Sequence, residues 1–245
     1  SALANSYNIP AVKALQHVGV PALQRLASRL GITTLIRPDY GLSLTLGGGE
    51  ASLLEMTGAF AVFANNGERI EPHAILKVVT DGGDLLEDNS GRSGPLVMSP
   101  AHAFLLNSML SDTIARRPAF GSTSRMLELS DRPVAAKTGT TDDWRDGWTV
   151  GYTPQLASGV WVGNTDNQEM NKLSGVRSAA PIWKQFMQSA HDGLPVELFA
   201  RPAGVEEREV CDGTGFLAHP ECEQRHKEFF KTDQLPPEPT PIPTP

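Results

Sequence analysis

The sequence contains no continuous run of about eighteen apolar residues and no cluster of lysine and arginine. The first absence excludes a transmembrane helix within these residues. The second, with 21 basic against 28 acidic residues, removes the basic surface that is typical of binding to nucleic acid or anionic lipid. We therefore expect no nucleic-acid partner, and a formal net charge of −7 that mainly serves solubility.

Cysteine is scarce, with only Cys211 and Cys222, both near the C-terminus. In an exported protein the two could pair, whereas the alternative is two unpaired thiols or an incidental pair in a loop. His219 and His226 give no recognised ligand spacing with them, so we expect no metal site. The six histidines show no spacing typical of a partner to a nucleophile and are interpreted as surface or packing residues.

The sequence also has no initiator methionine, and its first residues lack the basic and apolar regions of a signal peptide. We expect a piece of a longer protein. The 245 residues, 40% of them hydrophobic, suffice for one sizeable core or for one domain with an extension.

Hydrophobic periodicity predicts a helix over 10–31, which Pro21 could restart, and a stronger helix over 50–66. Ser52 and Glu55 form the capping-box pattern of the second helix. The other expected elements follow along the chain. They are a hairpin over 69–88, a helix over 99–116, strands over 133–141, 148–152 and 158–162, and a helix over 180–191 that has Pro181 near its start.

The segment Lys137-Thr138-Gly139-Thr140 follows an apolar stretch that reads as a buried strand. Alternation along a strand puts both threonine hydroxyls on one face, and Gly139 lets another extended backbone approach. These features suit a peptide carboxylate bound along a strand edge. The alternative for so short a pattern is a strand end followed by a turn.

Near the start, Ser6-Tyr7-Asn8 precedes Lys137 by 131 positions. A serine and an asparagine two positions apart before a proline can face one cavity, although a helix cap or an Asx turn gives the same pattern. The glycines at 47–49 do not form a phosphate loop, because the required Lys-Ser/Thr is absent.

In its wider context, the stretch from Lys137 through Asn164 closely resembles the third-motif region of class A penicillin-binding proteins, the bifunctional enzymes that polymerise and cross-link peptidoglycan. Ser6-Tyr7-Asn8 fits the Ser-x-Asn form of the second motif, and 46–67 resembles the segment between the motifs. Two further segments, 119–121 and 174–183, resemble the C-type subgroup. The resemblance covers roughly residues 1 to 230.

The resemblance implies an α+β fold, an antiparallel sheet flanked by helices as in penicillin-binding proteins and serine β-lactamases, truncated on its N-terminal side. Residues 1–193 would be the C-terminal part of the transpeptidase domain, 194–234 a short strand and loop extension, and 235–245 a Pro-rich linker or disordered tail. Such a truncation would expose a sheet edge. We therefore expect a companion chain, a swapped dimer or disorder near residue 1.

The implied activity is serine acyl transfer between peptidoglycan stem peptides ending in D-Ala-D-Ala, with β-lactams as inhibitors and no cofactor. Ser6 would relay a proton, Asn8 would bind the substrate amide, and Lys137 would keep the site positive and orient Ser6. Thr138 and Thr140 would hold the substrate carboxylate, and the backbone N–H of Thr140 would be one oxyanion donor. Gly139 would be substrate-binding with them. The parent would be anchored at the extracytoplasmic face of the bacterial plasma membrane through a preceding segment.

One part of the family pattern is absent, because no lysine in this sequence has serine three positions before it. The Ser-x-x-Lys nucleophile would precede Ser1, so we expect this chain to be inactive alone. The alternative is a non-catalytic module that senses β-lactams or binds a partner. A secreted β-lactamase is disfavoured by the 131-residue gap and the Pro-rich tail. Trp144, Asp146 and Trp148 are expected to be structural, with Asp143, Arg145 and Asp146 forming a local ion pair.

Overall fold

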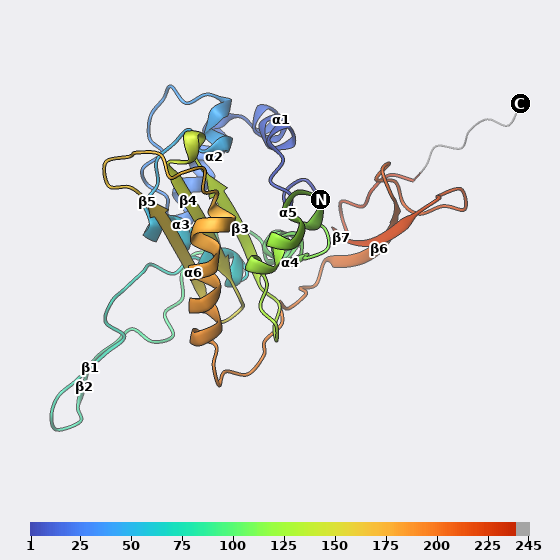
Figure 1. Ribbon diagram of the computed structural model, residues 1–245. Coiled ribbons are helices and arrows are strands. Elements are labelled where there is room, and N and C mark those ends of the chain that lie inside the picture. Colours follow the sequence, from blue (N-terminus) through green and yellow to red (C-terminus); the bar gives the residue numbers. More distant parts are fainter. Residues whose placement is uncertain (239–245) are drawn as a thin grey trace, which may run out of the picture.

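A three-stranded antiparallel sheet with helices on both faces forms the centre of the protein (Figure 1). The computed structural model describes residues 1–238, so most of the predicted Pro-rich tail, 239–245, lies outside the described residues. The sheet has the order β3-β4-β5, and its strands are β3 Ala135–Thr140, β4 Asp146–Tyr152 and β5 Ala157–Gly163. All three predicted strands are therefore present, within a few residues of their expected bounds.

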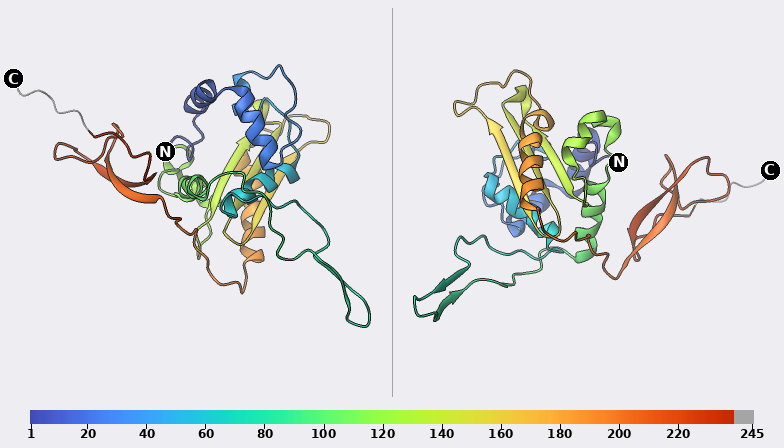
Figure 2. Two further views of the ribbon diagram at one scale, coloured as in Figure 1. Left: turned by 180° about the vertical axis from the view of Figure 1, so that it is seen from behind. Right: turned by 60° about the horizontal axis from the view of Figure 1, so that its bottom comes forward.

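Helix α6 (Gly175–Ala190) covers one face of this sheet, while α3 (Leu53–Ala64) and α4 (Pro100–Ser111) cover the other (Figures 1 and 2). Consecutive residues of β3 show why. Ala136 belongs to a buried cluster with Trp183 and Met187 of α6. Ala135 belongs to a second cluster with Tyr152 and Leu110. The side chains of a strand alternate between faces, so one apolar strand closes two hydrophobic layers.

The predicted helix over 10–31 is instead two helices, α1 Asn8–Val18 and α2 Val20–Leu30. Gly19 separates them with φ 86°, a left-handed conformation that glycine adopts without steric cost. Pro21 then lies in the first turn of α2, where its missing N–H costs no hydrogen bond. The prediction that Pro21 restarts the helix is confirmed, and a single continuous helix is wrong.

The capping box of α3 is confirmed in both directions. Ser52 Oγ accepts from Glu55 N over 3.1 Å, and Glu55 Oε2 accepts from Ser52 N over 3.2 Å. Glu55 also accepts from the backbone N–H and the hydroxyl of Thr33, so it fastens the end of α2 to the start of α3. These hydrogen bonds lower the pKa of Glu55 to about 2, because each one stabilises the ionised carboxylate.

The helix predicted over 99–116 ends earlier, at Ser111. Ser99 is its N-cap and Pro100 its first residue, as expected. Asp112 stops the helix, because its carboxylate accepts hydrogen bonds from Ile114 N at 2.9 Å and Ala115 N at 2.8 Å. The chain then enters the short helix α5, Arg117–Phe120, and the 3-10 helix η2, Gly121–Leu127.

The late helix predicted over 180–191 begins earlier, at Gly175, so that Pro181 lies inside α6 rather than near its start. A proline inside a helix removes one backbone hydrogen bond. Ala179, Ala180 and Trp183 are completely buried, and this packing around the proline outweighs the lost hydrogen bond.

Two hairpins project from this body (Figure 2). The first, β1 Lys77–Val79 with β2 Leu85–Asp88, confirms the hairpin predicted within 69–88. The second, β6 Val205–Cys211 with β7 Arg225–Lys231, lies in the predicted extension. Phe229 of β7 makes an edge contact with Phe104 of α4 at 5.1 Å between ring centroids, and this contact docks the extension on the body.

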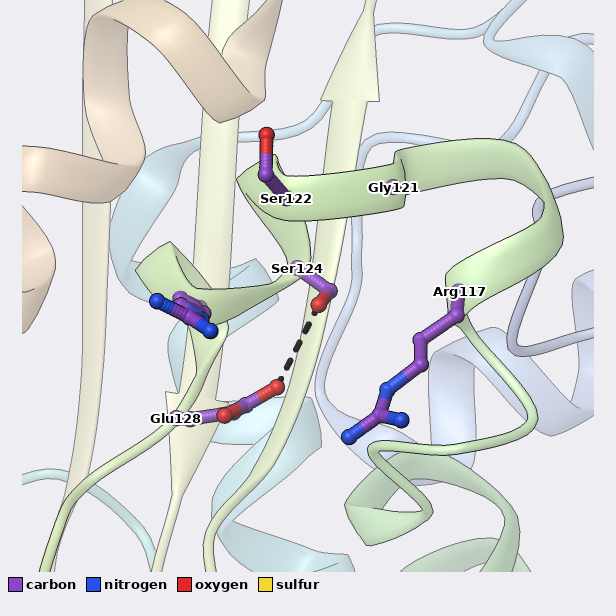
Figure 3. A pocket seen from close by; sticks show the side chains of 6 residues that line it. Arg117, Gly121, Ser122, Ser124 and Glu128 are labelled. Atoms are coloured by element: carbon purple, nitrogen blue, oxygen red, sulfur yellow. Dashed lines mark hydrogen bonds between the residues drawn. The ribbon is translucent and has the colours of Figure 1, made fainter.

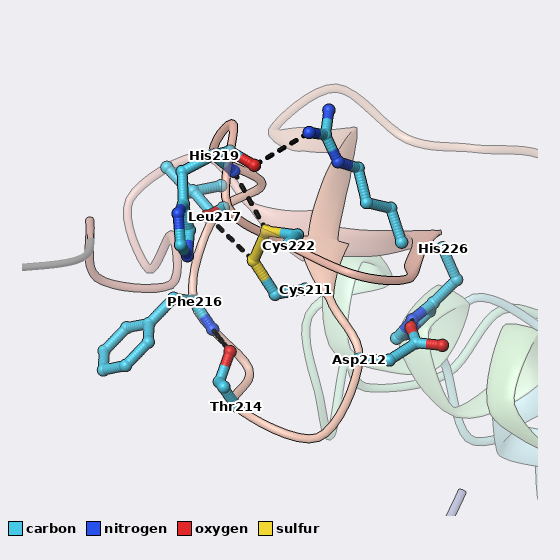
Figure 4. The surroundings of a disulfide bond; sticks show 9 residues. Cys211, Asp212, Thr214, Phe216, Leu217, His219, Cys222 and His226 are labelled. Carbon is cyan, nitrogen blue, oxygen red and sulfur yellow. Dashed lines mark hydrogen bonds and ion pairs between the residues drawn. A yellow bond between two sulfur atoms is a disulfide. The ribbon is translucent and has the colours of Figure 1, made fainter.

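Cys211 and Cys222 form a disulfide with their Cα atoms 5.4 Å apart, which decides between the paired and unpaired alternatives that the sequence left open (Figure 4). His219 lies close enough that its ring and the two sulfurs could share a metal ion geometrically. The bond between the sulfurs removes the thiolates that such an ion would need. Among residues 1–238, no helix has both the length and the apolar character needed to cross a bilayer.

Candidate active site

The structure brings together two residues that the sequence had only proposed as partners. Lys137 of β3 donates a hydrogen bond from Nζ to Ser6 Oγ over 2.7 Å, across a sequence separation of 131. The same ammonium donates to Thr138 O over 2.7 Å. Ser6 precedes α1 in a turn, with φ 57°, and its side chain is exposed. Because Oγ accepts from the lysine, the hydroxyl proton of Ser6 remains free to donate.

Lys137 stands in an environment that disfavours its charge. Burial, followed by repulsion from Arg116, lowers the pKa of Lys137 from 10.5 to about 8. At neutral pH the amine is therefore still mostly protonated, but the proton is held less tightly than on an ordinary lysine. A group with these properties can serve both as a fixed positive charge and as a participant in proton transfer.

The rest of the motif strand is divided between the two faces of the sheet. Residues two positions apart share a face of a strand, so Thr138 and Thr140 lie on the same face as Ala136, which packs against α6. Lys137 shares the opposite face with Ala135. Thr140 Oγ1 accepts a hydrogen bond from Gly175 N at the start of α6 over 3.0 Å. The predicted common face of the two threonines therefore agrees with the alternation of β3.

Gly139 lies opposite Trp148 in the register of β3 and β4. A Cβ atom built at Gly139 would come within 3.3 Å of Trp148 Cβ, so a side chain there would crowd the tryptophan. Within the described residues β3 pairs only with β4, and its other edge carries no strand. An extended peptide could therefore add to that edge, as the sequence analysis expects.

Asn8 is the member of the predicted site that the structure does not join to the others. It is the first residue of α1 and is exposed. In the described part of the chain its side chain makes no hydrogen bond to Ser6 or Lys137. Two positions from Ser6, it still lies beside the same turn.

Three residues near the motifs were missed by the sequence analysis. Asn5 is buried and its side chain makes three hydrogen bonds to backbone groups. Arg116 is 1% exposed and donates to three carbonyl groups. Gly175 approaches β3 so closely that a Cβ would lie 2.3 Å from Gly139 O. No sequence motif marks Asn5 or Arg116. Gly175 lies in the segment 174–183 that resembles the C-type subgroup, but its close approach to β3 is seen only in the structure.

Asn5 also orders the first residues of the chain through its hydrogen bonds. Its side chain ties them to the segment before α5, and Ser1 O accepts from both its backbone N–H and its Nδ2. The residues from Ser1 onward therefore form hydrogen-bonded turns, and the expectation of disorder near residue 1 is wrong. The companion chain and the swapped dimer stay predictions.

The aromatic and charged residues after the motif have structural contacts. Asp146 accepts from Trp161 Nε1 over 2.7 Å and from the Thr141 hydroxyl over 3.2 Å, so it braces β4 against β5. Arg145 pairs with Asp143 at 3.7 Å. The expected ion pair is therefore made by Asp143 and Arg145, and the inclusion of Asp146 in it is wrong, since its oxygens point to Trp161 and Thr141.

A separate polar cavity of about 290 Å³ lies on α5 and η2 (Figure 3). In Figure 3 Ser124 and Glu128 point toward one another, joined by a hydrogen bond of 3.3 Å, and Arg117 reaches toward the same space. None of the predicted site residues lines it. Its lining residues are Arg117, Gly121, Ser122, Ser124, Arg125 and Glu128.

Residues 1–188 match the family model of the penicillin binding protein transpeptidase domain. The chain belongs to the penicillin-binding protein transpeptidase family. It is 36% identical over 202 residues to penicillin-binding protein 1A of Aquifex aeolicus (strain VF5), a match covering 82% of this chain and 27% of that protein. It is 33% identical over 234 residues to penicillin-binding protein 2D of Bacillus subtilis (strain 168), covering 94% and 33%.

Solved structures agree with this assignment. Penicillin-binding protein 1A from Haemophilus influenzae superposes with a TM-score of 0.82 at 25% identity, over 96% of this chain and 40% of that one. The PonA1 protein from Mycobacterium tuberculosis in complex with penicillin V gives a TM-score of 0.72 at 27% identity, over 82% and 58%. The expected α+β transpeptidase fold is therefore confirmed. The chain spans roughly a quarter to a third of the length of the two sequence relatives, and its C-type subgroup stays a prediction.

Proposed function

We propose that this chain is the C-terminal part of a penicillin-sensitive D,D-transpeptidase domain in a cell-wall synthase that cross-links peptidoglycan stem peptides. The observation that carries the proposal is the 2.7 Å hydrogen bond from Lys137 to Ser6, formed beside the free edge of β3. The membership of the transpeptidase family supports it. Residues 1–193 would belong to the transpeptidase domain, 194–234 to its extension, and 235–245 to a linker or tail.

The reaction is an acyl transfer to a serine. The serine oxygen forms an ester bond with the carbonyl carbon of the penultimate D-Ala, and the bond to the terminal D-Ala nitrogen breaks. The proton lost by the nucleophile must reach that leaving nitrogen. Ser6 can relay it, because its Oγ accepts from Lys137 while its own proton is free to be donated. An amine of a neighbouring stem peptide then takes the acyl group.

The motif strand would bind the substrate. A donor peptide would lie along the free edge of β3, with Thr138 and Thr140 donating to its terminal carboxylate and the N–H of Thr140 facing the oxyanion. Thr140 suits this role because Gly175 N–H occupies a lone pair of Oγ1 and so leaves the hydroxyl proton for the ligand. Asn8 would bind the amide on the acyl side of the scissile bond.

The nucleophile would come from a Ser-x-x-Lys on a segment preceding Ser1, because the 245 residues contain none. The chain by itself would then form no acyl-enzyme. The parent would also be a peptidoglycan glycosyltransferase, and an anchor in a preceding segment would hold it at the extracytoplasmic face of the bacterial plasma membrane.

Labelling with a fluorescent penicillin tests these statements. The chain alone should stay unlabelled, and the chain fused to its natural upstream segment should label once per molecule. Lys137→Ala in the fused protein should slow labelling by at least about 100-fold, the usual scale for losing a group in proton transfer. Lys77→Ala removes an exposed strand lysine of the projecting β1–β2 hairpin, so it is the matched control and should label normally.

Two outcomes would contradict the proposal. Stoichiometric labelling of the chain alone would show that its nucleophile lies within these residues. A fused protein that folds but resists labelling would favour the alternative, a non-catalytic module that binds a partner without acyl transfer.

A further inference from the structure

Asn5 and Arg116 are buried polar residues that lie behind the two motif residues and touch neither side chain directly. Asn5 is 4% and Arg116 is 1% exposed. Burying such groups costs free energy unless every donor and acceptor is used. Both residues make their side-chain hydrogen bonds to backbone groups. Asn5, which directly precedes Ser6, bonds to Ala115 and Ala119. Arg116 bonds to Ala136, which directly precedes Lys137.

Asn5 fixes the turn of Ser6 to α5 and to the segment before it. Its Nδ2 donates to Ala115 O over 2.6 Å, and its Oδ1 accepts from Ala119 N over 2.9 Å. Ser6 follows at once with φ 57°, a conformation that a serine rarely keeps without outside support. The asparagine therefore sets both the position and the direction of the Ser6 backbone.

Arg116 makes the corresponding connection to the motif strand. Its guanidinium donates to Leu127 O over 3.1 Å, to Ala136 O over 3.4 Å, and to Leu110 O. Ala136 is the residue directly before Lys137. Among residues 1–238, no carboxylate forms an ion pair with Arg116, so its planar fork of donors is used on carbonyl groups.

These contacts close a ring. Ser6 Oγ meets Lys137 Nζ, the neighbouring Ala136 O meets Arg116, the neighbouring Ala115 O meets Asn5, and Asn5 adjoins Ser6. We propose that Asn5 and Arg116 are positioning residues, which together hold Ser6 Oγ within hydrogen-bond reach of Lys137 Nζ and keep water from the buried side of that amine. The inference rests on the proposed function for its catalytic meaning, whereas the ring itself is testable in this chain.

The charged groups around the ring act on the pKa of Lys137, and this pKa is the quantity that an experiment can measure. Arg116 is the charged group that acts on Lys137, after burial, in lowering its pKa. Burial lowers the pKa of Arg116 itself, and the nearby Glu128 and Asp112 act in the opposite direction. Removing the guanidinium takes away a repelling charge and opens the ring to water. Removing the Asn5 side chain opens the ring but leaves the charge in place.

The experiment is an NMR titration of the 245-residue chain with ¹³C-labelled lysine Cε, in which Lys137→Arg identifies the Lys137 signal. The wild type should titrate near pH 8. Arg116→Met and Asn5→Ala should each move the midpoint upward, toward the 10.5 of an ordinary lysine, and Arg116→Met should move it further. Arg116→Lys, which keeps a cation, should stay closer to the wild type than Arg116→Met.

Arg132→Met is the matched control. Arg132 is also buried and also donates to carbonyl groups, those of His191, Leu194 and Pro195, but it touches neither motif. The Arg132→Met variant should have a lower melting temperature than the wild type, while the titration midpoint of Lys137 stays unchanged. If Arg116→Met does not fold, Arg116→Gln and Asn5→Ala carry the same comparison.

The proposal is overturned if the folded Asn5 and Arg116 variants titrate as the wild type does. It is overturned equally if Arg132→Met raises the midpoint as much, because the shift would then report general loosening. Failure of the penicillin labelling would remove the proposed function but leave these midpoints unchanged. The two ideas can therefore fail separately.

Discussion

Gly175 donates its backbone N–H to Thr140 Oγ1 over 3.0 Å, so the first turn of α6 is fastened directly to the last residue of the motif strand. The approach is possible only because residue 175 lacks a side chain. A Cβ at this position would lie 2.3 Å from Gly139 O and 2.5 Å from Trp148 O. The start of α6 is thus part of the wall that presents the threonine hydroxyl.

Gly175→Ala should therefore destabilise the protein by about 1–3 kcal/mol, the usual cost of overpacking, because β3 and α6 must move apart. Thr140 loses its hydrogen bond as a consequence. Urea unfolding measures the loss in free energy of unfolding. Labelling of the fused protein by the fluorescent penicillin should also slow.

Gly58→Ala is the matched control for this change. Gly58 lies inside α3 with nothing within 4 Å of a built Cβ, so alanine there should stabilise by about 0.5–1 kcal/mol. Equal effects of the two substitutions would contradict the close approach of Gly175.

The lowered pKa of Lys137 predicts a pH dependence of stability. The folded value of about 8 lies below the ordinary 10.5, so between these values the unfolded chain binds more protons than the folded one. The free energy of unfolding of the wild type, relative to Lys137→Met, should therefore rise from pH 8 to pH 10.5. Urea titrations of both proteins at several pH values measure the difference, and a flat difference would refute the shift.

The capping box predicts a second pH dependence, at acid pH. The pKa of Glu55 is lowered to about 2, so its contribution is present above pH 4.5 and is lost as the pH falls toward 2. Glu55→Gln should cost about 1 kcal/mol at pH 7, the typical worth of a cap, and almost nothing near pH 2. Glu223→Gln, at an exposed position, serves as the control and should change the free energy of unfolding at pH 7 by less than about 0.5 kcal/mol.

The disulfide predicts a local effect of reductant. Cys211 and Cys222 are 11 positions apart, and closing a loop of that length stabilises by about 3 kcal/mol in the chain-entropy model. Dithiothreitol should therefore speed amide hydrogen exchange in β6 and β7 but leave α6 protected. A Cys211→Ser/Cys222→Ser double variant should not respond to the reductant, and faster exchange throughout the body would contradict a local role.

Elements with local signals were predicted well. Ser52 and Glu55 cap α3, Ser99 caps α4, and the alternation around Lys137 gives β3, because the interactions that form these elements lie within a few residues of each other. The two helix boundaries that failed have different causes. Asp112 ended α4 through hydrogen bonds to Ile114 and Ala115, a local interaction that the hydrophobic pattern does not register. The start of α6 was decided at longer range, because its packing on the sheet extends the helix from Pro181 back to Gly175.

The sequence by itself determined the residue types of the site and the strand that bears them, since Lys137 through Thr140 needs only an extended, alternating backbone. Only the tertiary structure decided that Ser6 meets Lys137, that Asn8 stays apart, and that Asn5, Arg116 and Gly175 brace the site. These contacts join residues between 20 and 131 positions apart. A local pattern carries no information about them, because they exist only once the two faces of the sheet have been packed.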